Sequence, residues 1–362
     1  MKERRNGVRT RSRRPRAALL AMLFSALLAF AAGCGVKQEE PADGKLKVVT
    51  TIFPPYDFVR AIAGGEETVS VRMLLSPGEE VHSYEPTPLD IKEIQSCDLF
   101  IYVGGENDVW VERILANMGD QQPRSLRLTD LTDTVEEEAV EGMMEERGSG
   151  HEHGHAEDEE HGHDEETGEH VHSGDSSKEE HEEADEHVWT SPVKAAEITQ
   201  AIAQEMAELD PDNAQRYLAG GKAYEEQILE LDRQFREIAE SAQRRILIFG
   251  DRFPIRYFAE EYGLEYYAAF AGCSSESEPS ASTLAFLIDK VKEEEIPVVF
   301  SIEFSNGNIA RAICESTGAQ QRTFHSCHNV TKQQMESGAT YVSLMRGNLD
   351  AIREALGTGE SK

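Results

Sequence analysis

Two runs of alternating strand and helix patterns constrain the fold of this chain more than any other feature. The first run occupies residues 46–132, and the second occupies residues 243–362 and ends in a helix predicted over 333–356. Strands that alternate with helices form parallel sheets covered by helices on both faces. We therefore predict an α/β protein with two lobes, each with a mainly parallel sheet flanked by helices. The predicted strands are 46–52, 68–75, 99–103, 124–128, 245–249, 264–269, 297–302 and 320–324.

One long amphipathic helix is predicted to join the two lobes, over residues 212–242. Apolar side chains recur along it three or four positions apart, as in a helix that buries one face. Gly220 and Gly221 weaken this pattern locally, because glycine disfavours a helix interior. Residues 187–211, with a helix over 192–208, return the chain to the N-terminal lobe before the linking helix begins. The apolar positions are Tyr217, Tyr224, Ile228, Leu231, Phe235 and Ile238.

Residues 133–186 differ in composition from both lobes. They are acidic, polar and nearly free of aromatic side chains, so no core could form from them, and we predict a disordered acidic loop. Its histidines would bind zinc, nickel or copper weakly and release the metal as they protonate near pH ~6.5. We interpret the loop as an auxiliary metal-capture segment, and a solvated loop with incidental affinity is the alternative. These histidines are His151, His153, His155, His161, His163, His170, His172 and His181.

The N-terminus has the pattern of a secretory leader. Basic side chains precede an apolar run over residues 17–33, and small residues lie directly before Cys34. This ending resembles the bacterial lipobox, in which the cysteine is lipidated and becomes the mature N-terminus. We expect residues 1–33 to be a signal peptide, Cys34 to carry lipid, and residues 34–45 to be a tether at the extracytoplasmic face of the cell membrane. A permanent anchor is the alternative, although the run is barely long enough to span a bilayer.

Charge and cysteine usage limit the possible partners. The formal net charge at pH 7 is −32, so the chain lacks the positive face that nucleic-acid binding requires, and it attracts cations instead. Four cysteines besides Cys34 allow three disulfide pairings, and the sequence leaves the choice open. No CxxC motif is present, so a cysteine-only zinc knuckle is not expected.

Four histidines outside the acidic loop form the main candidate site. His82, His187, His325 and His328 each lie just after a predicted strand or just before a predicted helix. In open α/β sheets, ligands bind at the edge where the strands end. Four imidazoles at such edges could form a tetrahedral, nitrogen-rich site, which suits zinc. The alternative is that each of these histidines is a surface or capping residue.

Several motifs carry a family resemblance. GEEVHSYEPTPLDIKEI (78–94) contains His82, and EHVWTSP (186–192) contains His187. These segments resemble the two N-terminal ligand motifs of the zinc- and manganese-binding lipoproteins that serve ABC importers. A histidine-rich loop between the motifs is typical of the zinc members. Two further segments that resemble this family are VVTTIFPPYDFVRAIAG (48–64) and EPSASTLAFLIDKVKEEEIPVVF (278–300).

The resemblance implies two α/β lobes tied by a rigid helix, with the metal in the cleft between them and two ligands from each lobe. It makes His82 and His187 ligands of a transported Zn²⁺. It also implies a monomeric receptor that delivers the metal to an ABC permease and, through it, to a cytoplasmic ATPase. No enzyme is expected, because the sequence has neither a phosphate-cradling GxxxxGK[ST] motif nor a base arranged around a Ser or Cys.

The C-terminal lobe departs from the family pattern. Gly250 stands where the family places its third ligand, a histidine, and glycine cannot bind a metal. The fourth family ligand is an Asp after the last strand, and here that place reads FHSCHNV (324–330). We expect two histidines of this segment to supply the missing ligands. The predicted C-terminal ligands are His325 and His328, with Asp251 and Cys327 as possible alternatives.

The sequence alone is also compatible with other functions. A manganese or iron receptor of the same family would have more carboxylate in its site, so the histidine-rich loop and the histidine-rich site favour zinc. An envelope metal buffer or chaperone without an importer would use the loop alone. A metallohydrolase would need an open metal position beside a general base, and the sequence offers no convincing base.

Overall fold

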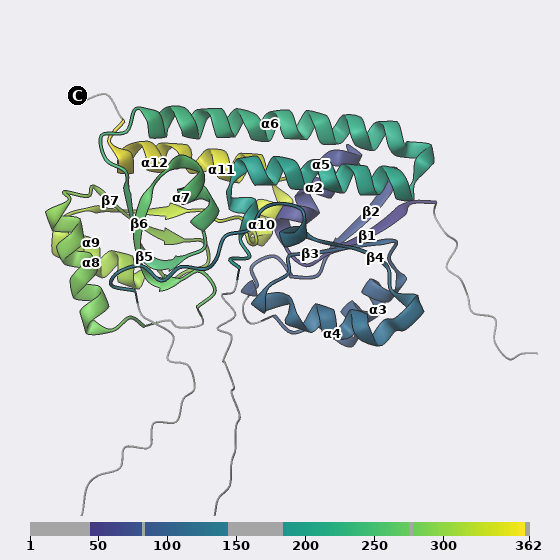
Figure 1. Cartoon of the computed structure of the whole chain (residues 1–362), viewed down its shortest axis with the longest axis horizontal. Coiled ribbons are helices and arrows are strands. Elements are labelled where there is room, and N and C mark those ends of the chain that lie inside the picture. The colour runs from purple at the N-terminus through teal and green to yellow at the C-terminus, as the bar shows by residue number, and fades with distance from the viewer. Residues whose placement is uncertain (1–43, 82–83, 144–183, 275–277, 359–362) are drawn as a thin grey trace, which may run out of the picture. The chain divides into compact units, whose positions relative to one another are not determined.

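The computed structural model describes residues 44–81, 84–143, 184–274 and 278–358 (Figure 1). The described residues from Lys45 onward form one compact unit. The predicted signal peptide, the predicted lipidation site Cys34, His82 and the eight loop histidines all lie outside the described residues. Within the described ranges, every helix is too short or too polar to cross a bilayer.

The N-terminal lobe contains β1 (Leu46–Thr50), α2 (Phe53–Ala63), β2 (Val69–Met73), α3 (Pro88–Ser96), β3 (Leu99–Tyr102), α4 (Val109–Met118) and β4 (Arg124–Arg127). Its strands are all parallel, in the order β2-β1-β3-β4. All four side chains of β3 are buried. Leu99 and Ile101 join the main core with α2, whereas Phe100 and Tyr102 pack in a second cluster with α3 and α4. Helices therefore cover both faces, as expected for a parallel sheet.

The C-terminal lobe repeats this plan. Its elements are β5 (Ile246–Phe253), α7 (Arg256–Tyr262), β6 (Glu265–Ala271), α8 (Ala281–Glu293), β7 (Val298–Ile302), α9 (Asn308–Thr317) and β8 (Gln320–Phe324). The strands are parallel, in the order β6-β5-β7-β8, which corresponds strand for strand to the order in the first lobe. The predicted α/β fold with two parallel sheets is confirmed.

Two helices connect the lobes, α5 (Pro192–Leu209) and the long α6 (Ala214–Glu240) (Figure 1). α6 contacts α2 and α5 at one end, and it contacts α7 and the C-terminal helices at the other. Gly220 and Gly221 lie where α6 passes closest to its neighbours. A Cβ on Gly220 would collide with the carbonyl of Ile62, and one on Gly221 would lie 2.5 Å from Ala203 Cβ. The two glycines therefore permit close packing of α6 against α2 and α5. The predicted long linking helix is confirmed.

The final helix differs from the prediction. Three helices replace the single one expected over 333–356, namely α10 (Lys332–Glu336), α11 (Tyr341–Gly347) and α12 (Leu349–Leu356). Gly338 adopts a positive φ of 75° after the first helix. Thr340 then starts the second with a capping box, in which its hydroxyl accepts a hydrogen bond from Ser343 N. Such a cap restarts a helix in a new direction.

Both ends of the segment predicted as a disordered loop are folded, which differs from the prediction over 133–186. Val135 N donates to Tyr257 Oη, and Asp185 N donates to Val135 O at 2.9 Å. Met143 is buried, and Gly142 packs closely on Phe286. Scattered apolar residues are sufficient to dock these ends onto the lobes. The short 3-10 turns are η2 (Glu106–Asp108), η3 (Gly119–Gln121), η4 (Leu128–Asp130), η5 (Val188–Thr190) and η6 (Pro211–Asn213).

Candidate metal centre

His187 lies directly before η5 and is oriented by Asp185. One Asp185 carboxylate oxygen accepts hydrogen bonds from His187 N and from His187 Nδ1, both at 2.8 Å. A carboxylate acceptor places the ring proton on Nδ1, so Nε2 carries the lone pair. His187 is fully buried, and among the described residues its Nε2 has no hydrogen-bond partner. A carboxylate behind an imidazole in this way is typical of metal-ligating histidines.

Negative charge surrounds this imidazole. Burial lowers the pKa of His187, but the carboxylates of Asp185, Glu186 and Glu137 raise it by more, so the pKa lies above its ordinary value. Glu186 is 3% exposed, accepts hydrogen bonds from Asn107, and has a pKa raised by burial. Within the described part of the chain, neither Asp185 nor Glu186 forms an ion pair with lysine or arginine. Buried carboxylates without a lysine or arginine partner favour a bound cation.

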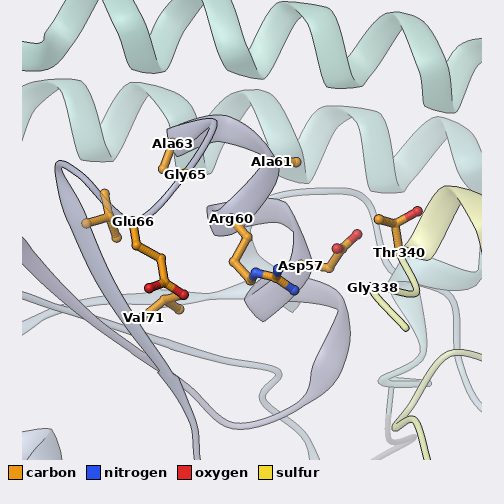
Figure 2. A pocket seen from close by; sticks show the side chains of 10 residues that line it. Asp57, Arg60, Ala61, Ala63, Gly65, Glu66, Val71, Gly338 and Thr340 are labelled. Carbon is orange, nitrogen blue, oxygen red and sulfur yellow. The ribbon is translucent and has the colours of Figure 1, made fainter. Parts of the chain in front are cut away.

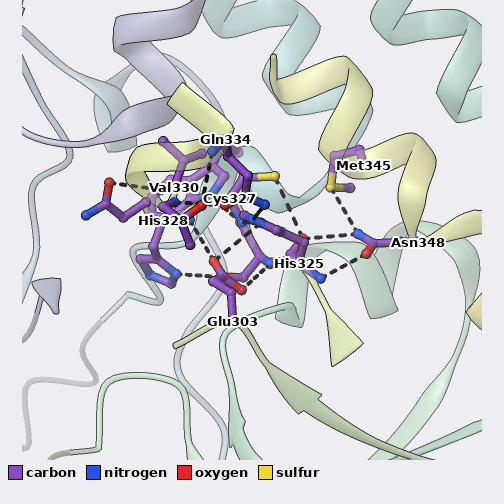
Figure 3. Close-up of polar contacts among 12 residues, drawn as sticks. Glu303, His325, Cys327, His328, Val330, Gln334, Met345 and Asn348 are labelled. Atoms are coloured by element: carbon purple, nitrogen blue, oxygen red, sulfur yellow. Dashed lines mark hydrogen bonds and ion pairs between the residues drawn. The ribbon is translucent and has the colours of Figure 1, made fainter. Parts of the chain in front are cut away.

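His328 lies in the loop after β8 and is oriented by a chain of hydrogen bonds that ends on the Glu303 carboxylate (Figure 3). The Glu303 carboxylate accepts from Ser326 N at 2.7 Å, from Ser326 Oγ at 2.7 Å and from His328 N at 3.2 Å. Because Ser326 Oγ donates to Glu303, it accepts from His328 Nδ1, which is 2.7 Å away. This network assigns the ring proton of His328 to Nδ1 and the lone pair to Nε2.

The structure brings these two predicted ligands side by side. The ring centroids of His187 and His328 are 4.7 Å apart, and the ring planes cross at 78°. Trp189 packs edge-on against both rings, at 5.6 Å from His187 and 5.0 Å from His328. Its indole Nε1 donates to Ser326 O at 2.9 Å, which fixes the loop of His328 against η5.

A third group joins His187 at the end of β6. Ligand atoms of Glu186, His187 and Cys273 all lie within 4.8 Å of one another. Cys273 follows Gly272 in the turn after β6, and a Cβ on Gly272 would lie 3.1 Å from His187 Cε1 and 3.0 Å from Phe253 O. Glycine at 272 therefore lets this turn approach the imidazole closely. Cys273 N donates to Glu137 Oε1 at 3.1 Å, which ties the turn to the folded segment after β4.

His82 lies outside the described residues, but its neighbours face the same region. Glu79, Glu80 and Val81 line a small hollow together with His328 and Glu303. The Asn329 side chain donates to Ser76 O at 2.8 Å and to Glu79 O at 2.9 Å. The loop that leads to His82 is thus attached to the loop that carries His328.

His325 is placed differently from His328. Its Nδ1 accepts a hydrogen bond from Cys327 N at 3.1 Å, and its Nε2 lies 3.3 Å from Gln334 Nε2 (Figure 3). Asn348 accepts from His325 N at 2.9 Å and donates to His325 O at 3.0 Å. Both ring nitrogens therefore contact the loop and the helices beside it, and these contacts give His325 a role in shaping the loop.

Asp251 and Gly250 occupy the end of β5. The Asp251 carboxylate accepts from Arg252 N at 2.9 Å and from Ile302 N at 3.3 Å, which joins β5 to β7. At Gly250, an added Cβ would lie 2.5 Å from both N and Cα of Ala310 in α9. No side chain fits there unless α9 shifts, so the close approach of this helix requires glycine at position 250.

Cys327 belongs to the core. It is fully buried, and its Sγ contacts His325 O at 3.8 Å. Burial raises the pKa of its thiol well above the ordinary value, which disfavours a thiolate. None of the four described cysteines forms a disulfide. The sulfur atom that groups with His187 belongs to Cys273, and Cys327 is not part of that group.

A separate hollow lies beside α2 (Figure 2). Asp57, Arg60, Glu66 and Thr340 line it together with small apolar residues, so its lining offers no imidazole or thiol. Asp57 accepts hydrogen bonds from Tyr224 Oη of α6 and from Tyr341 N of α11. One buried carboxylate thus connects a helix of each lobe to the linking helix.

Three residues of the centre were not predicted. Asp185 and Glu186 directly precede His187, and an Asp two positions before a candidate histidine was a usable signal. Cys273 comes two positions after β6, at the same kind of strand end that singled out the histidines.

The chain is similar to known zinc-uptake proteins. A family model described as zinc-uptake complex component A, periplasmic, matches residues 48–355. The high-affinity zinc uptake system protein ZnuA of Bacillus subtilis is 31% identical, over 92% of this chain and 96% of that protein. The zinc-binding lipoprotein AdcA of Streptococcus pneumoniae is 28% identical over 92% of this chain, which spans only 60% of the length of AdcA.

Solved structures show the same architecture. The metal-dependent lipoprotein YcdH of Bacillus subtilis superposes with a TM-score of 0.66 and 28% identity, covering 86% of this chain and 99% of that one. The Zn(II)-bound ZnuA-like domain of Streptococcus pneumoniae AdcA gives a TM-score of 0.65 and 25% identity, over 86% and 99% of the two chains.

Proposed function

Because the chain belongs to the family of periplasmic zinc-uptake complex components, we propose that it is an extracytoplasmic receptor that binds one zinc ion between its lobes for an ABC importer. The observation that carries this proposal is the pair His187 and His328. Both imidazoles have their ring proton on Nδ1 and are held edge to face, 4.7 Å apart, beside buried carboxylates. Neutral imidazoles with oriented outer partners are ligands that zinc prefers.

The proposed ligand set begins with His187, His328 and His82. His82 is included because its loop is attached to the His328 loop through Asn329. The contacts of His325, Asp251 and Cys327 favour structural roles, so the proposed ligand set excludes these three residues. The histidine-rich segment is proposed as an auxiliary site.

The proposed mechanism is capture in a largely preformed site. Residues of both lobes, α5 and α6 share one continuous core, and Asp57 links α2 to α11. Such packing opposes a wide hinge motion, so metal exchange requires rearrangement of the loops around the cleft. Lipid attachment at Cys34, a monomeric state and the absence of catalysis are parts of the same proposal.

The experiment is a competition titration of the purified protein with zinc and manganese against a chromogenic chelator. We expect one tight site that favours zinc and is lost in His187→Ala. The matched control is His325→Ala, which removes an imidazole from the neighbouring loop and should retain the site. Equal affinity for manganese, or a tight site that survives in both His187→Ala and His328→Ala, would refute the proposal.

A further inference from the structure

We propose that Cys273 is a sulfur ligand of the cleft metal, so that the ion is held by imidazole and thiolate together. This inference rests on the proposed function, because it assumes that a metal binds beside His187. It assigns metal ligation to the turn after β6, which contributed no residue to the predicted ligand set.

The first support is the position of the sulfur. Ligand atoms of Cys273, His187 and Glu186 lie within 4.8 Å of one another, and they come from two separate segments of the fold. Gly272 holds the turn against the imidazole, because a Cβ there would lie 3.1 Å from His187 Cε1. Glu137 fixes the same turn from the other side through Cys273 N. Backbone contacts thus direct this turn to the metal centre.

The second support is independent of the cysteine. His187 is fully buried, its Nδ1 is engaged by Asp185, and among the described residues its Nε2 has no hydrogen-bond partner. A buried nitrogen lone pair without a donor costs on the order of 1–3 kcal/mol unless something satisfies it. A cation beside His187 removes this cost and also compensates the charge of the buried carboxylates.

The third support is that the other candidate C-terminal ligands are engaged elsewhere. No side chain fits at Gly250, because α9 passes too close. Asp251 binds backbone N–H groups of β5 and β7. Cys327 is fully buried in the core, whereas Cys273 is only partly buried. Among the described cysteines, Cys273 is the one grouped with a histidine and a carboxylate.

A thiolate in this position has a consequence for specificity. Sulfur ligands favour zinc and other soft or borderline ions, whereas manganese prefers oxygen. Replacing the sulfur by oxygen should therefore weaken zinc binding by about 10-fold or more, and should change manganese binding much less.

The experiment is a titration of the purified protein with Co²⁺, which reports thiolate ligation as an intense near-ultraviolet charge-transfer absorption. We expect this absorption in the wild type, its loss in Cys273→Ser with visible d–d bands retained, and its persistence in the matched control Cys314→Ser. A wild-type spectrum with d–d bands but no charge-transfer absorption would overturn the inference and leave the proposed function intact. If neither Co²⁺ nor Zn²⁺ binds at all, the inference and the proposed function are both wrong.

A measurement on the wild type guards against misfolding of the variant. Iodoacetamide labelling followed by peptide mass spectrometry gives the reactivity of each cysteine. We expect zinc to slow labelling of Cys273 at least about 10-fold and to leave Cys314 unchanged. Equal labelling of Cys273 with and without a saturating zinc concentration would contradict sulfur ligation.

Discussion

The two lobes have the same strand order, yet they hold their histidines in different ways. In the segment that leads from the N-terminal lobe into α5, His187 donates directly to a buried carboxylate, with Glu186 beside it. In the C-terminal lobe, His328 donates to the hydroxyl of Ser326, and this hydroxyl in turn donates to the Glu303 carboxylate. Equivalent sheets thus carry chemically different sites, because the loops at the strand ends determine the chemistry and the strands determine the scaffold.

Removing each imidazole tests the comparison most strongly. We expect His187→Ala to weaken zinc binding by about 1,000-fold, or ~4 kcal/mol, and His328→Ala to weaken it less, because buried carboxylates support His187 directly. Competition titration measures both affinities. A larger loss of zinc affinity in His328→Ala than in His187→Ala would show that His328 contributes more to binding.

The carboxylate that joins the lobes gives a stability prediction. Burial raises the pKa of Asp57 from 3.8 to about 6, so the folded state binds this proton more tightly than the unfolded state. The folded protein should therefore gain stability relative to Asp57→Asn as the pH falls through 6. We expect a gain on the order of 2 kcal/mol between about pH 7.5 and 4.5. Urea unfolding of both proteins at each pH provides the measurement, and a constant difference would contradict the burial effect.

Asp185 and Ser326, which accept hydrogen bonds from the two imidazoles, should contribute differently to zinc affinity. We expect Asp185→Asn to weaken zinc binding by about 10-fold, because the amide supports the Nδ1–H less well and removes negative charge. Ser326→Ala removes the neutral hydroxyl that lies between His328 and Glu303, and it should cost only about 3-fold. Titration of the two variants in parallel measures this ratio, and equal losses would show that charge behind the imidazole does not matter here.

Removing His325, the neighbouring histidine in the loop after β8, should affect zinc affinity less. We expect His325→Ala to change zinc affinity less than about 3-fold, and to lower the stability of the loop by about 1 kcal/mol through the lost contacts to Cys327 N and Gln334. Titration and thermal unfolding test the two parts separately. A loss of zinc affinity comparable to that of His328→Ala would restore His325 to the ligand set.

Deleting residues 151–181 should have the smallest effect on the tight site. We expect zinc stoichiometry to fall, because weak imidazole sites are removed, and the highest affinity to stay unchanged. Isothermal titration of the deletion variant resolves the two classes. Loss of the tightest site would move the metal centre from the cleft to the acidic segment.

Much of the fold could be predicted because the buried strands are short apolar runs, such as LFIY at β3. The break after Gly338 was missed, since the cap at Thr340 depends on local hydrogen bonds that an apolar pattern does not reveal. The folded ends of the acidic segment were missed for a related reason. Val135 and Met143 are too widely spaced to form a pattern, although each finds a partner surface in the fold.

The site was predictable only in part. The rule on strand ends and helix starts singled out His82, His187, His325 and His328, and it applied equally to Cys273. The choice between His325 and His328 depends on contacts with Gln334 and Asn348, which lie in helices whose positions the sequence did not define.

The close approach of α9 to Gly250 restricts how this protein can change over generations. A substitution to histidine there would first have to displace the backbone of Ala310, so it would fail at folding before it could be selected for metal binding. A single mutation to histidine therefore does not place an imidazole at the end of β5. If the metal binds as proposed, its preference can change through the turns after β6 and β8, whereas the end of β5 accepts a side chain only after α9 has shifted.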